Sequence, residues 1–125
     1  MALISGIAHV NLIVPADTLE RATAFYAGTL GLAPRPVPHL QAHRLAWFDV
    51  GDSGQQVHIA FGRTCDFEGA AAQSSRHPCF RIGSPEALQQ LQARVFAHFR
   101  DGGEAAPLAC DEPGQVNSGE SLVGL

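Results

Sequence analysis

The chain has 125 residues, a formal net charge of −4 and 46% hydrophobic residues, enough for one core. It has no basic stripe to neutralise phosphates, which argues against a nucleic-acid partner. It also lacks a stretch of transmembrane length and the features of a signal peptide, which argues against a membrane partner. Cys65, Cys79 and Cys110 are too widely spaced for a disulfide framework or a zinc motif, so we expect reduced thiols and a cytoplasmic location.

The first expected strand covers residues 7–14, where side chains alternate between two faces. His9 shares one face with Asn11 and Ile13, and the other face is apolar. After it, Asp17 with Glu20 three residues later predicts a capping box and a helix start. The expected helix carries an apolar stripe before a terminating Gly31. That stripe consists of Leu19, Ala22, Phe25, Tyr26 and Leu30.

Three further segments follow the first helix. Residues 34–38 are typical of a short edge strand or a loop, and residues 44–50 and 55–62 of strands joined by a turn at 51–54. In the last strand, His58 lies with Gln56 and Ala60, opposite Val57, Ile59 and Phe61. The histidine is again on the more polar face.

Residues 64–76 are expected to be a linker before a second unit of the same kind. Residues 77–82 alternate as a strand, with His77, Cys79 and Arg81 on one face. Ser84 and Pro85 predict an N-cap and the start of a second helix, which should end at Gly102. The apolar stripe of that helix is Leu88, Leu91, Val95, Phe96 and Phe99. Residues 104–110 are expected to form one more strand, and residues 111–125 show no convincing strand pair.

His9 and His77 begin equivalent strand-to-helix units 68 residues apart, so the sequence contains an internal repeat. Together with His58, they give three strands that each present one imidazole on a polar face. Neutral imidazole suits divalent zinc, iron, manganese or nickel, so the pattern predicts a metal site. For any one of the three, a hydrogen-bonded strand residue is the alternative. We interpret His39 and His43 as solvated loop residues and His98 as a surface residue near a helix C-terminus.

With these motifs the chain resembles the vicinal oxygen chelate superfamily, which includes glyoxalase I, bleomycin resistance proteins and extradiol dioxygenases. The resemblance implies an α+β fold of paired β-α-β-β-β modules forming a curved sheet cup. It implies one domain over residues 1–125, with module one at 5–63, a linker at 64–76 and a partial module two at 77–125. The second module is expected to be incomplete, because the repeat places a fourth ligand near position 126 and Glu120 is a poor substitute.

The resemblance further implies metal ligands at His9, His58 and His77, and a small oxygen-rich organic substrate chelated by the ion. Asn11 and Arg81 are candidate substrate-binding residues, with a sheet hydrogen bond and a salt bridge as their alternatives. The corresponding activity is that of a metal-dependent lyase or dioxygenase. The other hypotheses are a non-catalytic small-molecule binding or resistance-type module and an inactive truncated family member. An unpaired sheet edge predicts a homodimer.

Overall fold

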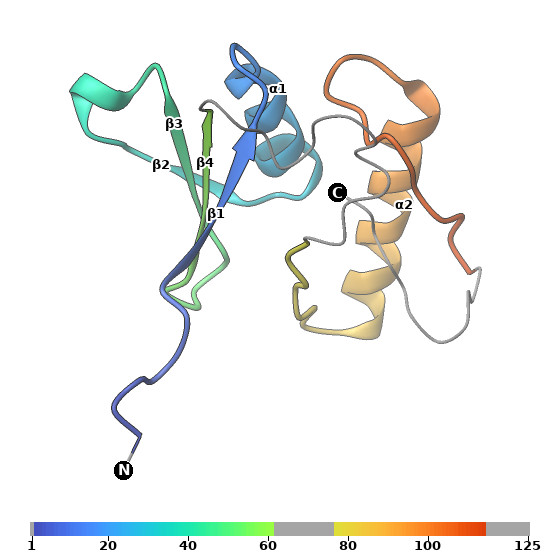
Figure 1. The fold of residues 1–125 in the computed structure, drawn as a ribbon. Helices are drawn as coiled ribbons and strands as arrows, with labels where there is room; N and C mark the ends of the chain where they lie inside the picture. Colours follow the sequence, from blue (N-terminus) through green and yellow to red (C-terminus); the bar gives the residue numbers. More distant parts are fainter. Residues whose placement is uncertain (1, 62–76, 115–125) are drawn as a thin grey trace.

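The computed structural model describes residues 2–61 and 77–114, and these form a small α+β fold (Figure 1). A strand leads into a helical segment, three more strands follow, and a second helix comes after residue 76. The elements are β1 (His9–Val14), α1 (Leu19–Thr23), the π-helix η1 (Ala24–Thr29), β2 (Ala33–Arg35), the 3₁₀ turn η2 (His39–Gln41), β3 (Leu45–Asp49), β4 (Gln56–Phe61) and α2 (Pro85–Asp101). The first unit is therefore the expected β-α-β-β-β arrangement.

The four strands form one curved, unclosed sheet in the order β1-β4-β3-β2. β1 runs parallel to β4, with Asn11 opposite His58, whereas β3 is antiparallel to both β4 and β2. A turn with positive φ at Gly51 and Gly54 joins β3 to β4, as the sequence predicted. This order places β4, which carries His58, in the middle of the sheet between β1 and β3.

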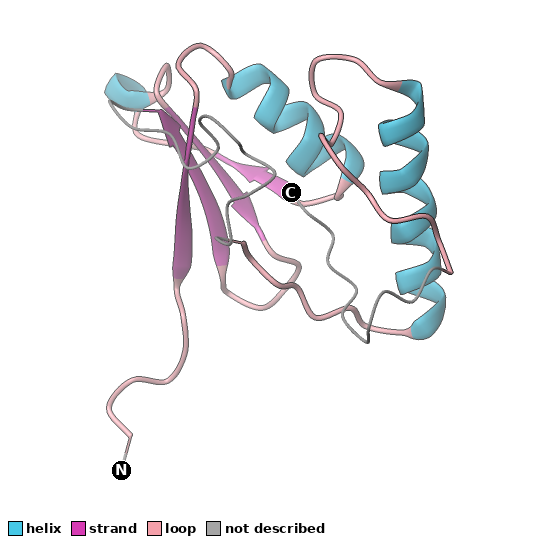
Figure 2. Ribbon diagram, turned by 45° about the vertical axis from the view of Figure 1, so that its right-hand side comes forward, coloured by secondary structure: helices cyan, strands magenta, loops and turns pink. Residues whose placement is uncertain are grey.

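One face of the sheet forms the hydrophobic core. Phe48, Val57 and Ile59 are no more than 1% exposed, and they point toward the α1–η1 segment. Helical residues Phe25 and Tyr26 cover this face, and their rings meet edge to face at 5.4 Å. Figure 2 shows the helices on the same side of the sheet, with α2 farther away than α1. The opposite face of the sheet therefore carries the remaining side chains of each strand, because successive side chains point to opposite faces.

The start of α1 differs from the predicted capping box. Asp17 has φ of 62°, and the helix N-cap is Thr18, which makes no side-chain cap hydrogen bond. The Thr18 hydroxyl instead donates to the Pro15 carbonyl at 2.5 Å. Asp17 takes the left-handed conformation that aspartate tolerates. It lies one residue before the N-cap, so it is not the capping residue. The predicted end at Gly31 is confirmed by its φ of 75°.

The second helix begins as predicted. The Ser84 hydroxyl accepts a hydrogen bond from the Ala87 amide at 3.1 Å, and Pro85 is the first helical residue. Of the expected apolar stripe, Val95 is buried, whereas Leu88 and Phe99 are 39% and 36% exposed. The rest of the described structure therefore covers only part of this apolar stripe.

Helix α2 packs against η1 rather than against the sheet. Arg94 donates to the Gly28 carbonyl at 2.8 Å, and the Thr29 hydroxyl and His98 Nδ1 are 2.6 Å apart. The prediction of His98 as a surface residue is wrong, because it is half-buried between this hydroxyl and the Phe25 ring. Its partner lies 69 residues earlier in the chain, so no local pattern indicates the contact.

The second unit contributes α2 but neither of its expected strands within the described residues. Residues 77–82 and 104–110 are irregular, although Phe80 still packs against the core. The expected linker at 64–76 and the chain after residue 114 lie outside the described residues. In the described parts of the chain, no helix is long and apolar enough to cross a membrane.

Candidate functional site

The candidate site is the polar face of the sheet, opposite the helices. Strand alternation places His9 and Asn11 of β1 and His58 of β4 on this face, as predicted. The same alternation in β3 adds Trp47, which lies opposite His58 in the strand register. We call these four residues the polar-face cluster.

Three rings of the polar-face cluster stack in a row across neighbouring strands. The His9 and His58 ring centroids are 4.0 Å apart with planes 13° from parallel. The Trp47 and His58 centroids are 4.6 Å apart with planes at 14°. Because β4 lies between β1 and β3, the His58 ring is held between the other two rings. Both faces of the His58 ring are therefore covered by its neighbours, and the row of rings carries two imidazoles.

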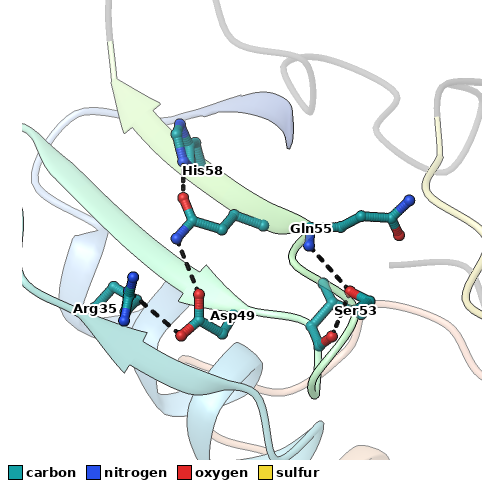
Figure 3. Close-up of polar contacts among 7 residues, drawn as sticks. Arg35, Asp49, Ser53, Gln55 and His58 are labelled. Atoms are coloured by element: carbon teal, nitrogen blue, oxygen red, sulfur yellow. Dashed lines mark hydrogen bonds and ion pairs between the residues drawn. The ribbon is translucent and has the colours of Figure 1, made fainter. Parts of the chain in front are cut away.

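His58 is also the end of a chain of polar contacts. Its Nε2 lies 2.8 Å from Gln56 Oε1, and Gln56 Nε2 donates to Asp49 Oδ1 at 2.9 Å. Asp49 Oδ2 in turn pairs with Arg35 Nε at 3.4 Å (Figure 3). Partial burial, and secondly the neighbouring His9, lower the pKa of His58, so it is neutral near pH 7. A neutral imidazole keeps one ring nitrogen as a lone-pair donor.

The other residues predicted for the site lie in different surroundings. His77 and Arg81 are exposed in the irregular segment before α2. Within residues 2–61 and 77–114, no three His, Cys, Asp or Glu side chains gather in a way that could hold a metal. The structure therefore brings together His9, His58 and Asn11 but does not place His77 beside them, and the role of His77 stays a prediction.

Trp47 and Asp49 were not recognised from the sequence as site residues. The signal was present, since alternation in β3 puts both opposite the buried Phe48 and on the same face as His58. Only the pairing of β3 with β4 makes them neighbours of His58, and that pairing is a long-range property.

A β-α-β-β-β unit with helices on one face of a curved sheet and a polar face on the other defines a glyoxalase-type fold. Two solved structures are similar to this chain. One is a glyoxalase family protein from Bacillus anthracis, with 26% identity and a TM-score of 0.52, covering 75% of this chain and 73% of that one. The other is a lactoylglutathione lyase from Agrobacterium tumefaciens, with 22% identity and a TM-score of 0.48, covering 75% and 70%.

No family model and no curated protein matches the sequence. The likeness to the Bacillus anthracis protein confirms the predicted relation to the vicinal oxygen chelate superfamily at the level of fold. Fold alone does not assign a reaction, so the activity has to be argued from the polar-face cluster.

Proposed function

We propose that the protein binds a small, oxygen-rich organic molecule on the polar face of its sheet through a divalent metal ion. The observation that carries this proposal is the pairing of His9 and His58, two imidazoles from adjacent strands with ring centroids 4.0 Å apart. Imidazole is a common ligand of zinc, iron and nickel, and His58 is held in its neutral, ligating form. The fold relation to glyoxalase family proteins supports a small-molecule ligand.

In the described structure the His9 and His58 rings do not converge on one ion, and one ring has to turn before both can bind it. A ring nitrogen's lone pair lies in the plane of its ring, so two nearly parallel rings do not point at one common atom. His9 is exposed, and its ring contact is worth about 0.5–1.5 kcal/mol. That is small beside the roughly 10 kcal/mol that structural zinc binding contributes. The free energy of metal binding would therefore exceed the free energy lost when the His9 ring turns away from His58.

We assign the third ligand position to His77, on the strength of the resemblance. Three protein ligands leave open positions for substrate, and the bound ion would act as a Lewis acid that stabilises negative charge developing on substrate oxygens. Trp47, stacked on His58, offers apolar ring surface beside the ion for the carbon skeleton of the ligand. Asn11 is a hydrogen-bonding side chain on the same face, and Arg81 is the cation proposed to meet an anionic group.

A non-catalytic binding module is the second candidate function. It is favoured by the described structure, which lines up the rings of Trp47, His58 and His9 but does not gather a third ligand. A planar aromatic ligand could stack on the outer ring at either end of this row without any metal. Whether the protein binds a metal ion distinguishes these two candidate functions.

Titration of zinc into the protein by isothermal calorimetry tests the proposal. We expect about one equivalent in the wild type, and roughly 100-fold weaker binding in His9→Ala and in His58→Ala, because even outer-shell partners of a ligand are worth about 10–100-fold. His39→Ala, on the exposed η2 turn, is the matched control and should bind like the wild type. Loss of affinity in His77→Ala would support its ligand role. A wild type that binds no metal would overturn the proposal in favour of the binding module.

The homodimer and the cytoplasmic location stay predictions. Among the described strands, β1 and β2 are the outer two of the sheet. Outer strands favour pairing with a second chain where their edge is exposed. Light scattering measures this directly, and a strictly monomeric species would contradict the dimer.

A further inference from the structure

The polar contacts that end at His58 cross three strands in one line. Arg35 lies on β2, Asp49 on β3, and Gln56 and His58 on β4. Asp49 and Gln56 are register partners, which explains why the side chains meet on the same face of the sheet. In Figure 3, the line runs from Arg35 through Asp49 to His58, while the Gln55 side chain points away from it.

The chemistry of each group fixes the direction of every hydrogen bond in this line. An aspartate carboxylate has no proton to donate, so the Gln56 group facing Asp49 at 2.9 Å must be its NH₂. The Gln56 carbonyl oxygen then faces His58 Nε2 at 2.8 Å. A carbonyl oxygen only accepts, so Nε2 must carry the proton and donate it.

We propose that Gln56 and Asp49 are positioning residues that hold His58 as the Nε2–H tautomer, which leaves the lone pair, and so any ligand bond of this ring, on Nδ1. In water, neutral imidazole is a mixture of both tautomers, with the lone pair on either nitrogen. Here the Asp49–Gln56 pair selects one of them. Metal-ligating histidines commonly donate their other ring N–H to an oxygen in this way.

The two rings beside His58 fix the plane in which Nδ1 points. Trp47 and His9 stack on opposite sides of the His58 ring, with centroids 4.6 and 4.0 Å away. In the metal-free protein, the hydrogen bond to Gln56 prevents rotation within that stack and the two rings limit tipping out of it. If His9 turns toward an ion, Trp47 still covers one face of the His58 ring. The choice of Nδ1 as the ligating atom rests on the proposed function, whereas the tautomer does not.

The tautomer is measured by long-range ¹H–¹⁵N correlation spectra of metal-free protein labelled with ¹⁵N-histidine, above the titration range of the imidazoles. The His58 signals are those that disappear in His58→Ala. We expect a protonated, pyrrole-type shift at Nε2 and an unprotonated, pyridine-type shift at Nδ1. A proton on Nδ1 would overturn the proposal.

Two variants test the positioning role. Gln56→Leu removes the acceptor, and Asp49→Asn lets the Gln56 amide turn over, so both should move the two His58 nitrogen shifts toward each other as the tautomers mix. Gln55→Leu removes the same amide from the neighbouring exposed residue and should leave the shifts unchanged. Wild-type shifts in both Gln56→Leu and Asp49→Asn would overturn the role of the pair.

Adding zinc then separates this inference from the proposed function. If both hold, zinc moves the Nδ1 resonance and leaves Nε2 protonated. Zinc on Nε2 would overturn the inference while leaving metal binding intact. A wild type with the expected tautomer that binds no zinc would overturn the proposed function and the choice of ligating atom, but not the tautomer.

Discussion

Replacing the neighbouring residues Trp47 and Phe48 by alanine, one at a time, should separate the core face of the sheet from its polar face. Phe48 is 1% exposed beneath the α1–η1 segment. Trp47 is half-buried on the opposite face, where its main ring contact is His58. The two positions differ by one residue in sequence, so a slip of the strand by one position would exchange their roles.

The burial of each side chain sets the size of the two effects. Truncating a fully buried phenylalanine costs about 3–5 kcal/mol in transfer and cavity terms. For Trp47→Ala we expect about 1–2 kcal/mol, because its ring contact contributes about 0.5–1.5 kcal/mol and its burial is partial. With a urea slope of about 2 kcal/mol/M, the midpoints should fall by about 1.5–2.5 M and about 0.5–1 M.

Urea unfolding followed by far-UV circular dichroism measures both variants with one probe. Tryptophan fluorescence cannot follow both variants, because Trp47→Ala removes the only tryptophan of the chain. Phe48→Leu gives a milder loss if Phe48→Ala does not fold, and it should still lower the midpoint. Equal losses, or a larger loss for Trp47→Ala, would refute the assignment of the two faces.

Three further predictions concern single groups. Ser84→Ala should lower the free energy of unfolding by about 1 kcal/mol, because it removes the cap to the Ala87 amide, and Ser84→Asp should restore it; unchanged urea midpoints would contradict this. Burial raises the pKa of Tyr26 to about 12, so the stability it contributes is complete below pH 10 and lost as the pH rises through about 12. As the only tyrosine, it reports alone in an ultraviolet titration, where a midpoint near 10 would contradict its burial. Partial burial, then His9, lower the pKa of His58 below 6.5, so the folded protein binds fewer protons and stability falls as the pH drops from about 6.5 through that lower pKa. In an NMR titration of the metal-free protein, His9→Ala should raise the His58 pKa, and no change would argue against their coupling.

The faces of β1 and β4 were predictable because strand alternation is a local property. His9 and Asn11 were expected on one face, and the buried Val57 and Ile59 on the other, and the structure confirms both expectations. The cap of α2 at Ser84 was predictable for the same reason, since an N-cap needs only its next three residues.

Features that depend on the path of the chain were not predictable in the same way. Asp17 had the right spacing for a capping box. In the turn after β1, however, it has a left-handed conformation, and Thr18 is the N-cap residue. Residues 77–82 alternate like a strand, yet they form no strand in the structure. Alternation favours a strand only where a neighbour is available to pair with it.

The ring contacts of the candidate site are long-range, so the sequence indicated which strand residues share a face but not which of them touch. Trp47 meets His58 through the pairing of β3 with β4, and His98 meets Thr29 through the docking of α2. The three-histidine pattern put His9 and His58 on one face of the sheet, but it did not indicate that their rings would stack, and residue His77 lies in an irregular segment.

The most direct test of the proposed metal site is to follow backbone and histidine NMR signals while zinc is added to the wild-type protein. We expect the largest shifts on the polar-face cluster, at His9, Asn11, Trp47 and His58, with little change at His39 or in the core around Ile59. Shifts centred on other histidines, or no shifts at all, would contradict the proposal that this face of the sheet is the metal-binding site.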